Sequence, residues 1–346
     1  MMAQAQAQML KDNFGREITY LRIAVTDLCN LRCVYCMPPE GVKCSPREEV
    51  LRFEEIQRLV RVATGLGVRR VRLTGGEPLA RRDVLKFVAM LRELPGLEDI
   101  SLTTNGTLLA PQARALRDAG LNRVNISLDT LRPERFASIT RRGRLEDAWQ
   151  GIEAALAAGL HPVKLNTVIA RGWNDDELAD LARLTLDMPV HVRFIELMAL
   201  GETLGWQRQA RVSVAEMRQG LSRAFGARLV PAVAGDGWVP PGNGPARYLR
   251  LEGARGSIGL ISPVTEHFCA GCNRLRLSAT GVLRPCLLST REVDVKGPLR
   301  GGASDDELAE VFRRAVLAKP EMQEIPQLAN DPSDRDPGRF MSQIGG

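Results

Sequence analysis

The sequence has no long hydrophobic run, few aromatic residues and only three histidines. No stretch of about 18 uncharged apolar residues occurs, and the first ten residues lack an apolar segment of signal-peptide length. These absences argue against a membrane span and predict a cytoplasmic protein. Aromatic residues make up 5% of the chain and do not alternate with the arginines. A protein that stacks nucleic-acid bases would need such an arrangement, so no nucleic-acid partner is expected.

The length and apolar content predict a large folded core. The chain has 346 residues, 44% of them hydrophobic, which is enough for two domains. Lysine and arginine number 47 against 41 acidic residues, a net charge of +6. An excess of this size is typical of a solvated surface, and it suits an anionic partner only where the cations gather at one place.

Strand-like and helix-like segments alternate through the first two thirds of the chain. Six short segments rich in β-branched residues are separated by helix-like segments, several of which end at a glycine. This order predicts parallel strands joined by right-handed helical crossovers, in a partial (βα)6 barrel with its chemistry at the carboxyl ends of the strands. The expected strands are 21–27, 69–74, 99–104, 123–128, 162–169 and 190–197, and the expected helices are 54–67, 83–94, 111–120, 145–159 and 175–187.

The character of the sequence changes near residue 230. A segment rich in glycine and proline is followed by four short strand candidates, at 248–253, 256–262, 274–279 and 281–286. A last helix is expected over 305–319, beginning after Ser304. We therefore predict a core domain over residues 13–230 and a smaller C-terminal domain over residues 231–346.

Six of the seven cysteines form two triplets about 230 residues apart, Cys29, Cys33 and Cys36 near the start and Cys269, Cys272 and Cys286 near the end. In a reducing compartment such clusters indicate metal ligands before disulfides. Three thiolates so close together suit a 4Fe-4S cluster in which one iron keeps an open position for another ligand. Zinc sites completed by Cys44 or by His267 are the alternatives. A second interpretation is a non-enzymatic iron-sulfur or zinc protein that binds nucleic acid through its arginines, and the low aromatic content argues against it.

Cations occupy alternate positions of several expected strands. Because side chains alternate between the two faces of a strand, Arg22 lies opposite Leu21 and Ile23, and Arg72 lies opposite Val71 and Leu73. Lys164, Arg274 and Arg276 follow the same pattern. Cations buried in a sheet need a counter-charge, so their convergence predicts an anionic ligand.

The first triplet, CNLRCVYC, comes just after the first strand, and TGGEP at 74–78 follows the second. These motifs resemble those of the radical S-adenosylmethionine superfamily, in which the open iron binds the methionine group and the products are methionine and a 5′-deoxyadenosyl radical. The second triplet, in CAGCNRLRLSATGVLRPCL, and the terminal Gly-Gly resemble the GTP 3′,8-cyclase (MoaA) family of molybdenum cofactor biosynthesis. The resemblance runs from about residue 13 to the end of the chain.

The resemblance implies a lyase with two 4Fe-4S clusters and S-adenosylmethionine as cofactors. The radical takes hydrogen from ribose C3′ of GTP, and the carbon radical attacks guanine C8. It implies S-adenosylmethionine contacts at Tyr35, Gly76, Ser127 and Met198, and GTP contacts at Arg22, Arg72, Thr103, Lys164, Arg274, Leu275 and Arg276. Arg274, Arg276, Gly345 and Gly346 are expected to act in catalysis, and Arg193 and either Arg69 or Arg70 are further candidates.

The resemblance also implies partners. They are GTP as substrate, an electron donor of the flavodoxin or ferredoxin type, and a downstream cyclic pyranopterin synthase, with the chain a monomer or homodimer. The alternative enzyme is a peptide-modifying radical enzyme with an auxiliary cluster. Its C-terminal domain would usually carry more than three cysteines.

Overall fold

Six parallel strands form the centre of the fold in the order in which they follow one another along the chain. The computed structural model describes residues 9–198, 206–233, 235–242, 244–323 and 340–344. The six strands are β1 (Tyr20–Thr26), β2 (Arg70–Gly75), β3 (Asp99–Thr104), β4 (Arg123–Ser127), β5 (Val163–Ile169) and β6 (Val190–Glu196). Each predicted strand is therefore present, within one or two residues of its expected bounds.

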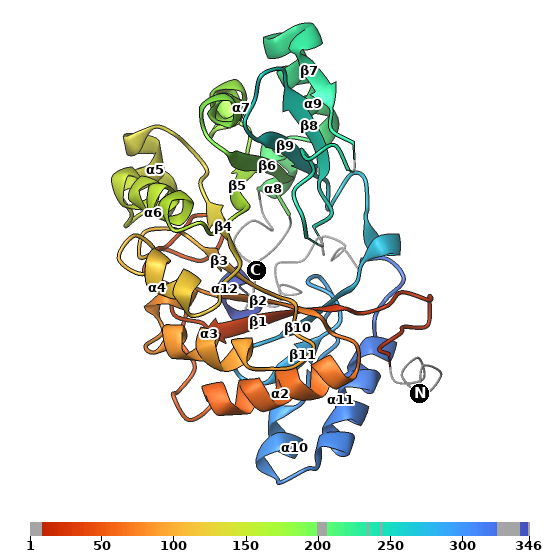
Figure 1. The fold of residues 1–346 in the computed structure, drawn as a ribbon. Helices are drawn as coiled ribbons and strands as arrows, with labels where there is room; N and C mark the ends of the chain where they lie inside the picture. Colours follow the sequence, from red (N-terminus) through yellow and green to blue (C-terminus); the bar gives the residue numbers. More distant parts are fainter. Residues whose placement is uncertain (1–8, 199–205, 234, 243, 324–339, 345–346) are drawn as a thin grey trace.

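Helices cover the outer side of this curved sheet (Figure 1). They are α2 (Phe53–Gly65), α3 (Val84–Arg92), α4 (Ala113–Asp118), α5 (Pro133–Thr140), α6 (Leu145–Ala157) and α7 (Leu178–Asp187), with short 3-10 turns η1 (Pro78–Ala80) and η2 (Asp175–Glu177). The strand residues that face these helices, such as Leu21, Ile23 and Leu73, are fully buried in one continuous core. Burial of this apolar face, at roughly 25 cal/mol per Å², drives the sheet and helices together.

Strands from the C-terminal third extend both edges of the same sheet. Beside β6 lie β9 (Ser257–Ile261), β8 (Arg247–Leu251) and β7 (Leu229–Pro231), and beside β1 lie β10 (Arg274–Leu277), β11 (Val282–Arg284) and β12 (Val293–Asp294). Both β9 and β10 are parallel to their neighbours in the central sheet. The division of the chain at residue 230 stays a prediction.

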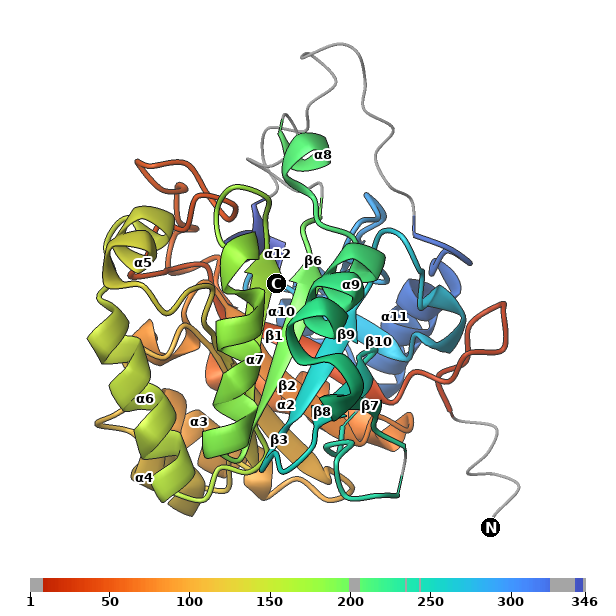
Figure 2. The ribbon, with the colours of Figure 1, turned by 90° about the horizontal axis from the view of Figure 1, so that it is seen from above.

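The remaining helices are α8 (Gln207–Ala210), α9 (Val214–Phe225), α10 (Lys296–Arg300), α11 (Asp305–Leu317) and α12 (Met341–Ile344), with the turns η4 (Gly226–Arg228) and η5 (Cys269–Gly271). Figure 2 shows α9 beside α7, and the two pack together next to β6. The C-terminal α12 packs against β1 and β2, on the side of the sheet away from α2 and α3 (Figure 1).

The start of α11 confirms the helix predicted after Ser304. Ser304 accepts a hydrogen bond from the Glu307 backbone N–H at 3.2 Å, and the Glu307 carboxylate accepts one from the Ser304 N–H at 2.7 Å. This reciprocal cap satisfies two backbone donors that the helix itself leaves free. The expected helix over 175–187 is instead divided into η2 and α7, and α5 and α9 were not predicted. No helix in the described ranges is long and apolar enough to cross a membrane.

Candidate active site

A cavity lies against the inner face of the sheet and is closed by segments from the C-terminal third of the chain. Alternate residues of each strand point into it, as in Arg123, Asn125 and Ser127 of β4. The strands of a parallel sheet that is buried on both faces normally have continuous apolar sequences. Here one face is polar because it borders this cavity, whereas the other face packs against helices.

All five strand cations that were predicted to converge line this cavity, namely Arg22, Arg72, Lys164, Arg274 and Arg276. Thr103 also lines the cavity, and the Arg72 Nη1 donates to its hydroxyl at 3.4 Å. Leu275 does not, since its side chain is 1% exposed within the apolar core. Roles of these residues toward a ligand stay predictions.

Three of the arginines lie side by side on adjacent strands. Arg22 of β1 is in register with Arg276 of β10 on one side and with Arg72 of β2 on the other. Neighbouring strands are about 4.8 Å apart, and like charges directly opposite one another are destabilising. Burial and the neighbouring Arg276 hold the pKa of Arg22 well below its ordinary value. An anion over this row would offset the repulsion among the three guanidinium groups.

Positive charge dominates the whole cavity wall. Asp129 is the one carboxylate among the described residues that line it. Eight lining residues are basic, namely Arg22, Arg72, Arg123, Lys164, Arg193, Arg274, Arg276 and Lys319. An effective dielectric of 20 gives about 4 kcal/mol for one ion pair at about 4 Å, so this wall favours a polyanion strongly.

The pKa of Lys164 is also strongly perturbed. Its side chain is 2% exposed, and its Nζ donates to the Pro241 carbonyl at 2.7 Å. Burial, followed by repulsion from Arg193, Arg123 and Arg72, lowers the pKa of Lys164 to about 5. Without a bound anion, Lys164 is therefore neutral near pH 7.

Arg123 lines the same part of the cavity and was not predicted there. It forms a two-point ion pair with Asp99, at 2.7 and 2.6 Å. The Arg193 Nε donates a hydrogen bond to the side-chain Oδ1 of Asn166 at 2.9 Å. The alternation in RVNIS at 123–127 was sufficient to find Arg123, because it shares a face with Ser127.

Among the buried polar atoms at this wall, the Asn125 Oδ1 and the Arg72 Nε have no hydrogen-bond partner within the described part of the chain. An unpaired buried polar atom costs about 1–3 kcal/mol. Both residues line the cavity. A polar ligand that filled it would reach these atoms and remove that cost.

The second cysteine triplet lies at the cavity, where Cys269, Cys272 and Cys286 all line it. Burial opposes the thiolate of Cys272, but Arg274 and Lys319 outweigh it and lower the pKa of this thiol to about 6. A thiolate is the form that binds iron, so the donor set and its charge environment fit a cluster. Lys319 was not predicted, since a lysine at the end of a helix carries no signal for a distant cavity.

The first cysteine triplet lies in the loop after β1. In the described part of the chain Cys29, Cys33 and Cys36 form no disulfide, and all three are half-buried. Residues 33–36 form a turn, in which the Cys36 N–H donates a hydrogen bond to the Cys33 carbonyl at 2.9 Å. Burial raises the pKa of Cys29 and of Cys33, so these thiols favour the thiolate only when a metal binds them. No three potential ligands in the described ranges converge as they would on one metal ion. A 4Fe-4S cluster does not require this convergence, because each thiolate ligates a different iron.

Two glycines hold this loop close to the end of β2. A Cβ at Gly76 would lie 2.2 Å from the Leu28 carbonyl oxygen, and one at Gly75 would lie 2.1 Å from that of Thr26. Gly75 also has φ +140°, a conformation that L side chains rarely adopt. Close backbone approach therefore requires both glycines. Gly76 is not among the described residues that line the cavity, and its contact with a cofactor stays a prediction.

The other three residues expected at S-adenosylmethionine, Tyr35, Ser127 and Met198, line the cavity. Asp129 lies with them and was not predicted. Burial raises the pKa of Asp129 to about 6, although hydrogen bonds from Tyr35 and the Val168 N–H act against this. The Asp129 carboxylate is therefore largely ionised above pH 7.

The remaining candidates lie away from the cavity or outside the described residues. Arg69 is exposed beside Glu98, and neither Arg69 nor Arg70 lines the cavity. His267 is exposed with its Nδ1 2.7 Å from the Gln323 amide, and Cys44 contacts the Val42 carbonyl at 3.7 Å. Gly345 and Gly346 lie outside the described residues. The helix α12 ends directly before them, and its Met341 lines the cavity.

Two family models match the chain, one after the other. The Radical SAM superfamily matches residues 23–185, and Molybdenum Cofactor Synthesis C matches residues 190–325. The first match covers part of β1, the strands β2 to β5 and the loop of the first triplet, and it ends before β6, which lies in the second match. The second covers the strands added at the sheet edges and all three cysteines of the second triplet.

Several curated relatives match over nearly their whole length. The GTP 3′,8-cyclase of Heliobacterium modesticaldum is 55% identical over 335 residues, covering 97% of this chain and 99% of that protein. The GTP 3′,8-cyclase of Pelotomaculum thermopropionicum is 52% identical over 337 residues, covering 97% of this chain and 100% of that protein.

Among solved structures, Streptococcus suis SuiB bound to S-adenosylmethionine is similar, with a TM-score of 0.58 and 14% sequence identity. The match covers 90% of this chain and 70% of that one. This likeness concerns the fold alone.

Proposed function

Because this chain belongs to the GTP 3′,8-cyclase family, we propose that its cavity binds GTP and S-adenosylmethionine and cyclises GTP. The product is (8S)-3′,8-cyclo-7,8-dihydroguanosine 5′-triphosphate, and the reaction is the first step of molybdenum cofactor biosynthesis. One observation supports this most directly. A polycationic cavity has one cysteine triplet on its wall and another in the loop that carries Tyr35, which also lines it.

The row of arginines receives the triphosphate. Arg276, Arg22 and Arg72 lie in register on three adjacent strands, and Lys164 lies on the same inner face. A triphosphate carries roughly four negative charges, which one cation alone would not hold at about 4 kcal/mol for each pair. Thr103 adds a hydroxyl donor beside Arg72. Such a wall suits GTP better than a neutral peptide, the substrate of the alternative enzyme class.

The two triplets hold 4Fe-4S clusters with different tasks. Cys29, Cys33 and Cys36 hold the first, which when bound supplies the electron that splits S-adenosylmethionine. Tyr35, Gly76, Ser127 and Met198 hold that cofactor. Cys269, Cys272 and Cys286 hold the second cluster, beside the guanine of GTP.

Residues next to the second triplet orient the substrate. Arg274 and Arg276 lie two and four residues beyond Cys272, on the strand that forms part of the cavity wall. The Arg274 carbonyl accepts a hydrogen bond from Lys319 at 2.9 Å, which holds this strand in place. Leu275 offers only its main chain. Gly345 and Gly346 would reach the reacting atoms from α12.

The proposed domains, location, oligomeric state and protein partners rest on the same family membership. The C-terminal unit over 231–346 completes the cavity around the core over 13–230. We place the chain in the cytoplasm, as a monomer or homodimer. A flavodoxin or ferredoxin type protein donates the electrons, and a cyclic pyranopterin synthase takes the product.

The test uses protein purified and reconstituted without oxygen. It should bind about eight irons per chain if both clusters are 4Fe-4S, and should form 5′-deoxyadenosine and the cyclised nucleotide from GTP. Cys33→Ala should lose S-adenosylmethionine cleavage but keep about half of the iron. Arg276→Ala should keep all the iron and lose cyclisation, because it removes one cation from the row. Formation of 5′-deoxyadenosine by Cys33→Ala, or turnover at the wild-type rate by Arg276→Ala, would refute the corresponding assignment.

A further inference from the structure

The Tyr35 hydroxyl joins two parts of the chain that are 94 residues apart. It donates a hydrogen bond of 2.6 Å to the Asp129 Oδ2. Tyr35 stands between Cys33 and Cys36 in the first cysteine loop, whereas Asp129 lies two residues beyond the end of β4. Both residues line the cavity. This bond therefore ties the loop of the first triplet to the barrel wall.

The Asp129 carboxylate is itself held on its other side. Its Oδ1 accepts a hydrogen bond of 2.9 Å from the Val168 N–H on the neighbouring strand β5. Asp129 is 6% exposed. A carboxylate with one oxygen bound to a strand and the other to a hydroxyl has little freedom to turn, and bonds of this kind to a charged acceptor are the stronger ones.

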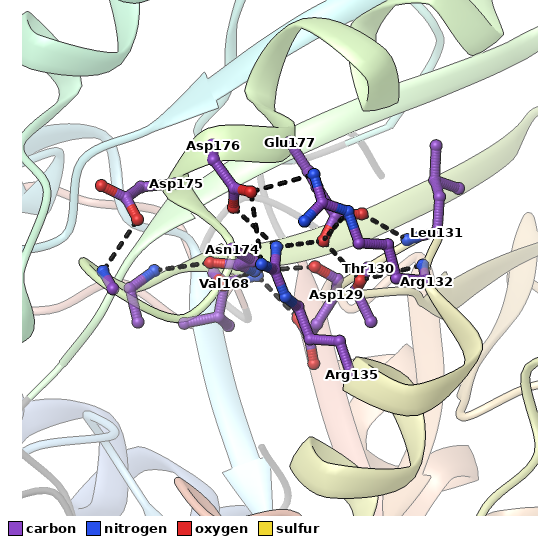
Figure 3. A network of polar contacts seen from close by, with 12 residues as sticks. Asp129, Thr130, Leu131, Arg132, Arg135, Val168, Asn174, Asp175, Asp176 and Glu177 are labelled. Atoms are coloured by element: carbon purple, nitrogen blue, oxygen red, sulfur yellow. Dashed lines mark hydrogen bonds and ion pairs between the residues drawn. The ribbon is translucent and has the colours of Figure 1, made fainter.

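The buried side-chain amide of Asn174 holds the backbone of Asp129 in place (Figure 3). The Asn174 Nδ2 donates to the Asp129 carbonyl at 2.7 Å and to the Val168 carbonyl at 2.9 Å. The Asn174 Oδ1 accepts from the Ala170 N–H at 2.9 Å. One side chain, 1% exposed, therefore connects the ends of β4 and β5.

Glu177 holds the turn that follows Asp129. Its carboxylate accepts hydrogen bonds from the Thr130 hydroxyl at 2.6 Å and from the Leu131 N–H at 2.7 Å. Arg135 donates to the same carboxylate and to Asp176, closing the network toward the surface (Figure 3). Neither Asn174 nor Glu177 is among the described residues that line the cavity. Their contacts reach it through Asp129.

We infer that Asp129 is a positioning residue for the first cluster site, which holds the Tyr35 hydroxyl and thereby fixes the orientation of the loop that carries Cys33 and Cys36. Asn174 and Glu177 keep Asp129 in the place from which it can do so. This inference rests on the proposed role of that loop in binding a cluster and S-adenosylmethionine. It assigns to the Tyr35 hydroxyl a task that is separate from any contact of Tyr35 with the cofactor.

The experiment is a double-mutant cycle in cluster-loaded full chain under strict anaerobiosis. The variants are Tyr35→Phe, which removes only the hydroxyl, Asp129→Ala, and the two combined. Affinity for S-adenosylmethionine is measured by equilibrium dialysis, and the electron paramagnetic resonance spectrum of the reduced cluster is recorded with and without the cofactor. Iron content and melting temperature are measured in the same samples.

We expect each single variant to lose affinity by about tenfold, the range of one hydrogen bond to a charged group, with iron content retained. The double variant should be no weaker than Asp129→Ala, because both changes break the same bond. Asp129→Asn keeps an acceptor oxygen and should recover most of the affinity and the wild-type spectrum. The matched control is Asp180→Ala on α7, which removes an exposed ion pair with Arg183 and should behave as wild type.

Three results would overturn the inference. They are wild-type affinity and spectrum in Asp129→Ala, losses that multiply in the double variant, or a loss of iron and melting temperature that Asp129→Asn does not restore. A wild-type chain that bound iron but no S-adenosylmethionine would overturn the proposed function instead, and with it the inference. Asn174 is too deeply buried to give a clean variant, so the test depends on Asp129 and Tyr35.

Discussion

Replacing Lys164 by methionine should make the protein more stable and at the same time remove the proton that it takes up on binding GTP. Lys164 is buried among cations, and its pKa falls to about 5 from an ordinary 10.5. Between these two values the unfolded chain binds one more proton at Lys164 than the folded chain does. The free energy of unfolding of the wild type therefore rises with pH across this window, by about 1.4 kcal/mol per unit.

The size of the effect at pH 7.5 follows from the same shift. Keeping Lys164 neutral three units below its ordinary pKa of 10.5 costs about 4 kcal/mol. Methionine avoids this cost and loses one hydrogen bond to the Pro241 carbonyl, a contribution of about 1 kcal/mol. Lys164→Met should therefore be more stable by about 3 kcal/mol at pH 7.5, and this advantage should shrink by about 1.4 kcal/mol for each unit of rising pH.

A bound triphosphate should raise the pKa of Lys164, because its negative charges favour the protonated amine. Wild-type protein should take up about one proton with each GTP at pH 8, well above the last phosphate pKa of about 6. Calorimetric titration in two buffers of different ionisation enthalpy measures this number, and Lys164→Met should give a value near zero. Lys86→Met, at a side chain 78% exposed, is the control and should match wild type. Equal proton uptake in wild type and Lys164→Met, or a stability difference that does not change with pH, would refute the reasoning.

Two further predictions concern glycines. Gly76→Ala should destabilise the chain by about 1–3 kcal/mol and lower iron retention at the first triplet, because the new Cβ would lie 2.2 Å from the Leu28 carbonyl oxygen. Urea unfolding and iron analysis check this against Gly65→Ala, where nothing lies within 4 Å, and equal results for the two would contradict it. Deleting residues 345–346 should leave melting temperature, iron content and GTP affinity nearly unchanged but reduce the yield of cyclised product per 5′-deoxyadenosine. An unchanged yield and rate would show that the two terminal glycines take no part in catalysis.

Local sequence patterns were sufficient to predict the strands and many of the residues that line the cavity. The alternation around Arg22, Arg72 and Lys164 predicts one inner face, because successive side chains of a strand point to opposite sides whatever the strand pairs with. The cap at Ser304 was likewise predictable, since its hydrogen bonds span only three residues. The eight-residue helix α5 was not found, because tertiary packing rather than periodicity carries much of the stability of so short a segment. The 12-residue helix α9 was missed although Ser213 and Glu216 form a capping box at its start, a local signal of the same kind as that at Ser304.

The sequence by itself determined the parallel α/β fold, the two cysteine triplets and the faces of the cationic strands, all of which depend on spacing along the chain. Only the tertiary structure placed Arg276 beside Arg22, brought Lys319 to the second triplet and joined Tyr35 to Asp129. Each of these contacts connects segments that are distant in the chain. Which distant segments meet is decided by how the whole sheet and its helices bury their apolar faces together, and no local pattern contains that information.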